Sequence, residues 1–155
     1  MAYAGFEGEQ NTVTLINGRW QGEPFVKGGA SRTVVTFVRD FHLIADLDVD
    51  NMDDAVVLLN ENSGGTGQNL YLAVVKSVNG KLQNVATKLI GDRVQIKIAR
   101  IEKGQIFFEI VRAGKEDAAC CPGEVLELGW NMTPQGLKEI VMPTTSQRLK
   151  PEIMA

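Results

Sequence analysis

The sequence has few of the residues on which the commonest catalytic and structural sites depend. It holds one histidine, His42, and two cysteines, Cys120 and Cys121, which are adjacent in the chain. These counts exclude a histidine-based metal triad, a four-cysteine zinc site and a long-range disulfide framework. The adjacent cysteines leave two alternatives open, a strained vicinal disulfide or a pair of thiols. The setting of His42 is typical of an ordinary strand position rather than of a catalytic group.

Long apolar segments and a large excess of one charge are also missing. No apolar run approaches the roughly 20 residues that a transmembrane helix needs. The chain has 16 Lys and Arg against 19 Asp and Glu, a net charge of −3, which argues against a dedicated nucleic-acid binder. With 155 residues, 44% of them hydrophobic, the chain is expected to form one domain with a genuine core.

The hydrophobic pattern has the period of strands rather than of helices. Residues 94–98 and 105–110 alternate between apolar and polar side chains, which predicts strands with one wet face. Residues 55–59 and 70–75 are almost wholly apolar, which predicts central strands covered on both faces. The sequence therefore predicts an all-β fold, an antiparallel meander of about nine or ten strands that forms a barrel or a two-layer sheet.

Short turn signals separate these runs and predict hairpins. They are Asn17-Gly18, Asn79-Gly80 and Lys103-Gly104, the first two being of the Asn-Gly type that tolerates the positive φ of a type I′ turn. The segment Thr133-Pro134-Gln135-Gly136 fits either a short helix or a β-turn, and we favour the turn.

The ends of the chain are expected to differ from the middle. We assign residues 1–142 to a single β domain and 143–155 to an extended tail without periodicity. Ala2-Tyr3-Ala4 matches the small-x-small pattern that ends a secretory signal peptide, so residues 1–10 are expected to be the leader of an exported chain. This predicts a periplasmic or secreted protein.

The most distinctive segment is rich in aspartate and leads directly into an apolar strand. Counted from Asp46, carboxylates fall at positions one, three, five and nine, which are Asp46, Asp48, Asp50 and Asp54; Met52 at position seven offers its carbonyl. These are ligand positions of EF-hand-type calcium loops, in which alternate side chains turn inward around one ion. The sequence therefore predicts a structural calcium (Ca²⁺) site made of these five residues.

Two features of this loop depart from an EF-hand. Position six, normally a glycine with a left-handed backbone, is Asn51, and position twelve is Val57 instead of a bidentate Glu. The coordination shell would therefore be completed by water, by Asp53 or by a distant group, with moderate or weak affinity. The alternative is a solvated acidic turn, although six acids between Asp40 and Asp54 have no Lys or Arg among them to offset their repulsion.

Several motifs together resemble a family of uncharacterised bacterial exported proteins and lipoproteins. The resemblance spans about Thr12 to Trp130 and depends on the following segments: Glu23-Pro24-Phe25, Gly28-Gly29-Ala30-Ser31, the Asp-rich loop, Glu61-Asn62-Ser63-Gly64-Gly65-Thr66-Gly67, Tyr71-Leu72-Ala73-Val74-Val75, Gly91-Asp92-Arg93-Val94-Gln95 and Cys120-Cys121-Pro122. The family typically has Gly where this chain has Val49 and Asn51. The resemblance implies an exported β domain and supplies no activity.

The sequence is compatible with three functions. The first is a non-enzymatic β domain with a structural calcium loop, a binding or assembly module at the cell envelope or outside the cell. The second is a hydrolase that acts on envelope polymers through paired carboxylates such as Glu61 or Asp92. The third is an accessory subunit of a larger extracytoplasmic assembly, with a protein partner.

Overall fold

The computed structural model describes residues 1–6, 12–24, 26–29, 31–62, 67–112 and 123–140. Twelve strands run through these residues: β1 (Ala2–Ala4), β2 (Thr12–Thr14), β3 (Arg19–Gln21), β4 (Val34–Phe37), β5 (Leu43–Ala45), β6 (Asp54–Asn62), β7 (Gln68–Val78), β8 (Lys81–Asp92), β9 (Gln95–Glu102), β10 (Gln105–Arg112), β11 (Glu124–Thr133) and β12 (Gly136–Ile140). The described ranges contain no helix, and so none that could cross a membrane. The predicted all-β class is confirmed. Cys120, Cys121 and the predicted tail lie outside the described residues.

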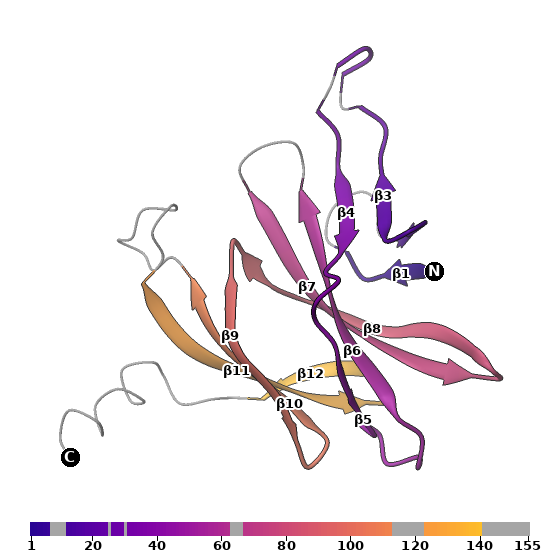
Figure 1. Cartoon of the computed structure of the whole chain (residues 1–155), viewed down its shortest axis with the longest axis vertical. Helices are drawn as coiled ribbons and strands as arrows, with labels where there is room; N and C mark the ends of the chain where they lie inside the picture. Colours follow the sequence, from indigo (N-terminus) through magenta and orange to yellow (C-terminus); the bar gives the residue numbers. More distant parts are fainter. Residues whose placement is uncertain (7–11, 25, 30, 63–66, 113–122, 141–155) are drawn as a thin grey trace.

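The strands form two main antiparallel sheets and one small one (Figure 1). The first sheet has the order β3-β4-β6-β7-β8, and β5 also pairs with β6. The second has the order β12-β11-β10-β9, and β1 pairs with β2. At the sides β5 lies against β9 and β8 against β12, yet the strands in the described part of the chain do not close into a barrel. Of the two predicted shapes, the two-layer sheet is therefore the one observed.

One hydrophobic core fills the space between the two main sheets, and a second covers the outer face of the first sheet. Leu58 and Leu72 face Phe108 and Trp130 in the first core, where the two aromatic rings meet edge to face at 5.4 Å. The second core joins alternate residues of β6 and β7 to buried side chains of the N-terminal segment: Tyr3, Phe6, Val13 and Leu15. Strands β6 and β7 are thus covered on both faces, as their apolar sequences predict.

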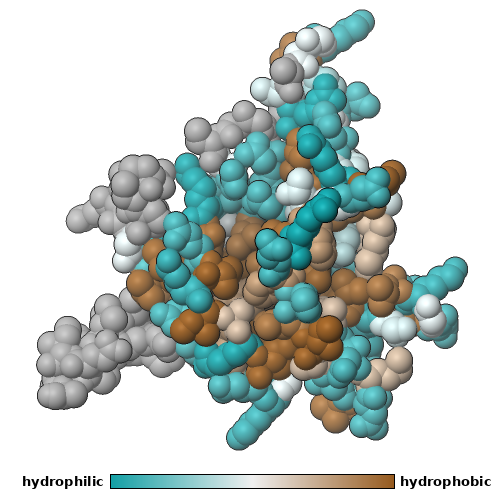
Figure 2. Space-filling view, in the orientation of Figure 1, coloured by the Kyte–Doolittle hydropathy of each residue, from teal (hydrophilic) through white to brown (hydrophobic). Residues whose placement is uncertain are grey.

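Apolar side chains gather between the two sheets at the centre of the face shown in Figure 2, and polar ones dominate the hairpin tips. All three predicted hairpin turns are present, and both residues of each have positive φ: Asn17 (54°) and Gly18 (80°), Asn79 (52°) and Gly80 (80°), Lys103 (51°) and Gly104 (77°). Pro134 and Gln135 form the turn between β11 and β12 rather than a short helix.

One predicted alternation is broken. The register of β9 against β10 shifts between Glu109 and Ile110, so that Glu109 pairs with Ile98 and Ile110 pairs with Ile96. This β-bulge leaves Lys97 unpaired in the ladder and turns Ile98 to the outer face, where it is 51% exposed. His42 also differs from its expected strand position, because it is exposed and lies just before β5.

Candidate metal centre

The Asp-rich loop joins β5 to β6 at one end of the sandwich. Asp46 follows directly after β5, and Asp54 is the first residue of β6. Between them, the side chain of Leu47 is 5% exposed and belongs to the core between the sheets. A Cβ on Gly104 would lie 3.6 Å from the carbonyl oxygen of Leu47, so the β9–β10 turn packs against the loop. The loop therefore contacts both main sheets.

Two residues of the loop have a left-handed backbone. Asn51 has φ 65°, as its place at position six predicts. Val49 has φ 58°, a conformation that a β-branched residue adopts only with strain. Sequence spacing does not predict it, because a β-branched residue at position four of the loop carries no signal for a left-handed backbone. The loop is closed by Asp46, which accepts the N–H groups of Asp50 at 3.1 Å and Asn51 at 2.8 Å.

Replacing Val49 by Asn is expected to stabilise the protein by about 1 kcal/mol, because Asn tolerates the left-handed conformation better than a β-branched residue. Little packing is lost, since Val49 is 85% exposed. Urea unfolding at neutral pH measures the change, with Val26→Asn as the control. Val26 is 71% exposed and has no positive φ, so its replacement should not stabilise the protein. An equal effect at both positions would contradict the backbone explanation.

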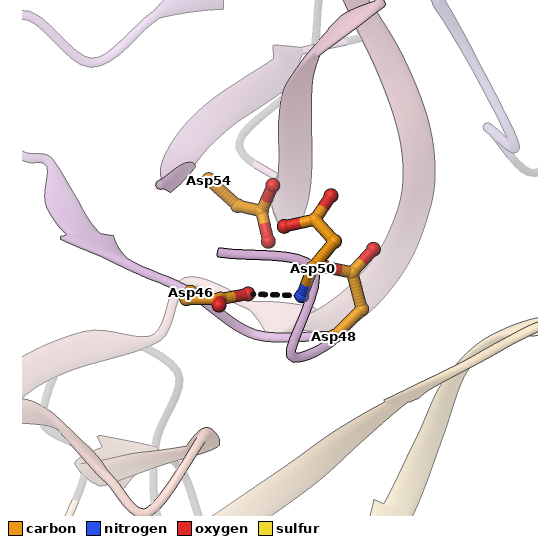
Figure 3. A group of neighbouring side chains, drawn as sticks. All are labelled: Asp46, Asp48, Asp50 and Asp54. Atoms are coloured by element: carbon orange, nitrogen blue, oxygen red, sulfur yellow. Dashed lines mark hydrogen bonds between the residues drawn. The ribbon is translucent and has the colours of Figure 1, made fainter. Parts of the chain in front are cut away.

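The loop brings four carboxylates together (Figure 3). Asp46, Asp48, Asp50 and Asp54 each offer one oxygen, and these oxygens all lie within 4.8 Å of one another. They are the four carboxylates that the spacing predicts. The fifth predicted ligand, the Met52 carbonyl, stays a prediction; the N–H of Met52 donates to Asp50 Oδ1 at 2.9 Å.

Asp54 is the most unusual member of this group, because it is only 2% exposed. Its Oδ2 accepts the N–H of Leu47 at 3.0 Å, whereas its Oδ1 is buried and has no hydrogen-bond partner among the described residues. Burial raises the pKa of the Asp54 carboxyl, and the nearby carboxylate of Asp48 adds to the effect. A buried oxygen without a partner is costly, and Asp54 Oδ1 has neither a hydrogen-bond donor nor a cation to satisfy it among the described residues.

Sequence reasoning missed a lysine that enters the loop from β7. The Lys76 ammonium pairs with Asp48 and with Asp50 Oδ2, the latter at 2.7 Å. Its hydrogen bond lowers the pKa of Asp50 to about 2, and the two carboxylates raise the pKa of Lys76. No Lys or Arg therefore lies among the acids between Asp40 and Asp54 in the sequence, but the fold places Lys76 beside two of them.

The pairing of β6 with β7 explains why Lys76 lies beside the Asp-rich loop. Ala55 pairs with Val75, and one step further in this register sets Lys76 opposite Asp54. The sequence between the two strands, residues 63–67, is rich in glycine and carries no signal for this register. Local sequence patterns therefore could not place Lys76 beside the loop.

The carboxylates of the hydrolase alternative lie away from this loop. Glu61 is near the other end of β6, and the Asn69 side chain donates to it at 3.2 Å. Asp92 accepts the N–H of Gln68 at 2.8 Å and pairs with Arg93 at 2.8 Å. In the sheet register Asn69 of β7 lies between them, paired with Glu61 of β6 on one side and with Asp92 of β8 on the other.

Compared with known protein families, curated proteins and solved structures, the chain shows no significant match.

Proposed function

We propose that this protein is an exported, non-enzymatic β domain whose β5–β6 loop binds a calcium ion, and that the ion stabilises a binding or assembly module at the cell envelope or outside the cell. The observation that carries the proposal is the buried, unpartnered Oδ1 of Asp54 within a group of four carboxylates. Oxygen ligands of this kind, on a short loop with alternate side chains turned inward, suit a hard cation.

The charge of the loop supports a divalent ion. By formal charge, the four carboxylates and the single ammonium of Lys76 leave about −3 at the site. Calcium takes six to eight oxygens in flexible geometry, whereas magnesium demands a near-ideal octahedron. The four carboxylates, the Met52 carbonyl and water would meet the requirement of calcium.

The position of the loop supports a structural role. Leu47 anchors the loop in the core, and the turn at Gly104 packs against it, so an ion there would hold both sheets together. A site without a bidentate Glu is expected to bind with moderate or weak affinity, which suits calcium-rich fluid outside the cytoplasm. Export itself is supported by the resemblance to exported proteins. Ala2-Tyr3-Ala4 adds no support, because these residues form β1 and Tyr3 is buried in the second core.

Calcium is expected to raise the melting temperature, and chelator to reverse the change. At a concentration of 100 times Kd, the stabilisation would be about 2.7 kcal/mol, or roughly 5 to 10 °C for a domain of this size. Differential scanning calorimetry measures it. Asp48→Ala should remove most of the response, whereas Asp53→Ala should not, because Asp53 is exposed and lies outside the carboxylate group. A full response in Asp48→Ala would show that the site is assigned wrongly.

A further inference from the structure

Lys76 is built into the sandwich rather than attached to its surface. Along β7 the side chains of Leu72 and Val74 belong to the core between the sheets, and Lys76 continues the same face. It leaves the core directly beside the loop, and its side chain is only 19% exposed. Its ammonium contacts Asp48 and Asp50, two of the four carboxylates.

From this geometry we infer that Lys76 is an internal competitor of the metal ion: calcium binds the loop by displacing the lysine ammonium from Asp48 and Asp50. This inference rests on the proposed function and adds the residue that sets the affinity. The ammonium and the ion would bind the same two carboxylates, Asp48 and Asp50, and two cations held that close together repel each other.

The reason for this exchange of the ammonium for calcium is that the ammonium does not satisfy every carboxylate of the loop. It pairs with Asp48 and Asp50, but the Oδ1 of Asp54 has no partner in the described structure. A divalent ion placed among oxygens that lie within 4.8 Å of one another would contact all four carboxylates. Calcium would therefore contact more carboxylates than the ammonium does. Its affinity is nevertheless lowered, because the interactions of Lys76 with Asp48 and Asp50 must first be broken. The same lysine keeps the metal-free loop folded by offsetting part of its repulsion.

The test is a calcium titration of the full chain by isothermal titration calorimetry. Lys76→Met keeps the length of the side chain and removes the charge, so it should bind calcium about tenfold more tightly or better. Lys97→Met is the matched control, because it removes the same charge from an exposed position on β9. It should change the affinity less than about twofold, since exposed charges at a distance are screened. Equal affinities for the wild type and Lys76→Met would overturn the inference.

A second measurement follows the lysine itself. In wild-type protein with isotope-labelled lysine, the Lys76 side-chain resonances should move during the calcium titration, and those of Lys97 should not. Lys76 resonances that stay fixed up to saturation would contradict displacement. If Lys76→Met is unfolded without metal, its calcium-induced refolding, followed by circular dichroism, gives the affinity instead. Lys76→Gln, which retains a donor, should then bind with intermediate affinity.

The outcomes separate this inference from the proposed function. Calcium binding by Lys76→Met but not by the wild type would support competition and would refute calcium binding by the natural chain. Binding by the wild type with no gain in Lys76→Met would keep the proposed function and refute competition. Absence of binding in every variant would refute both.

Discussion

Asp54→Asn is expected to abolish the calcium response and at the same time to stabilise the metal-free protein. Most substitutions at buried positions destabilise a protein, so this combination is diagnostic of a metal ligand. Asn keeps the shape of Asp and an oxygen that accepts the N–H of Leu47. It removes the buried charge, whose Oδ1 has no partner in the described structure.

The size of both effects follows from burial. An unsatisfied buried polar group costs about 1 to 3 kcal/mol, so the metal-free variant should gain roughly that amount in unfolding free energy. The side-chain amide that Asp54→Asn introduces would donate toward the neighbouring carboxylates instead of repelling them. With calcium, the wild type should be stabilised by several kcal/mol at saturating concentration, and the variant should show no shift.

Urea unfolding with chelator and with excess calcium measures both effects, and the pH dependence identifies their cause. Burial raises the pKa of Asp54 in the folded state above its unfolded value, so its ionisation begins to oppose folding as the pH rises past the unfolded pKa, and does so fully above the folded pKa. The advantage of Asp54→Asn in the metal-free protein should therefore be largest above the folded pKa, shrink as the pH falls below it, and disappear below the unfolded pKa. Asp53→Asn, on the exposed side of the loop, should show neither effect. A variant less stable than the metal-free wild type would contradict the interpretation.

The sequence predicts those parts of the fold that depend on local patterns. The apolar runs of β6 and β7 identify the central strands, and paired positive-φ residues such as Asn79-Gly80 identify the hairpins. The sequence does not predict the bulge that turns Ile98 outward, because the alternation of β9 is regular and the extra residue appears only in the register with β10.

The same distinction applies to the metal centre. The four carboxylates lie within nine residues, so their meeting in space follows from the spacing, and the left-handed backbone of Asn51 follows from its position in the loop. Lys76 lies 22 residues beyond Asp54 and reaches the site through the pairing of β6 with β7. Local sequence therefore brings the four carboxylates together, whereas the sheet register places the charge of Lys76 beside them.

Leu47→Ala is expected to lower both stability and calcium affinity although it changes no ligand. Leu47 is buried in the core between the sheets, so truncation should cost about 2 to 5 kcal/mol in unfolding free energy. The side chain also fixes the start of the loop between Asp46 and Asp48. Without this anchor, calcium must order a looser loop, and the affinity should fall about tenfold or more, because ordering even one or two residues costs about 1 to 2 kcal/mol each.

Ile110→Ala separates the role of the anchor from general destabilisation. Ile110 is fully buried in the same core but lies on β10, and its truncation should cost a similar amount. Calorimetric titration with calcium, at a temperature where both variants are folded, should give wild-type affinity for Ile110→Ala and reduced affinity for Leu47→Ala. Equal affinities would mean that the loop keeps its shape without its anchor. A selective loss would show that the core of the sandwich holds the carboxylates in place for the ion, so that folding and metal binding depend on the same side chain.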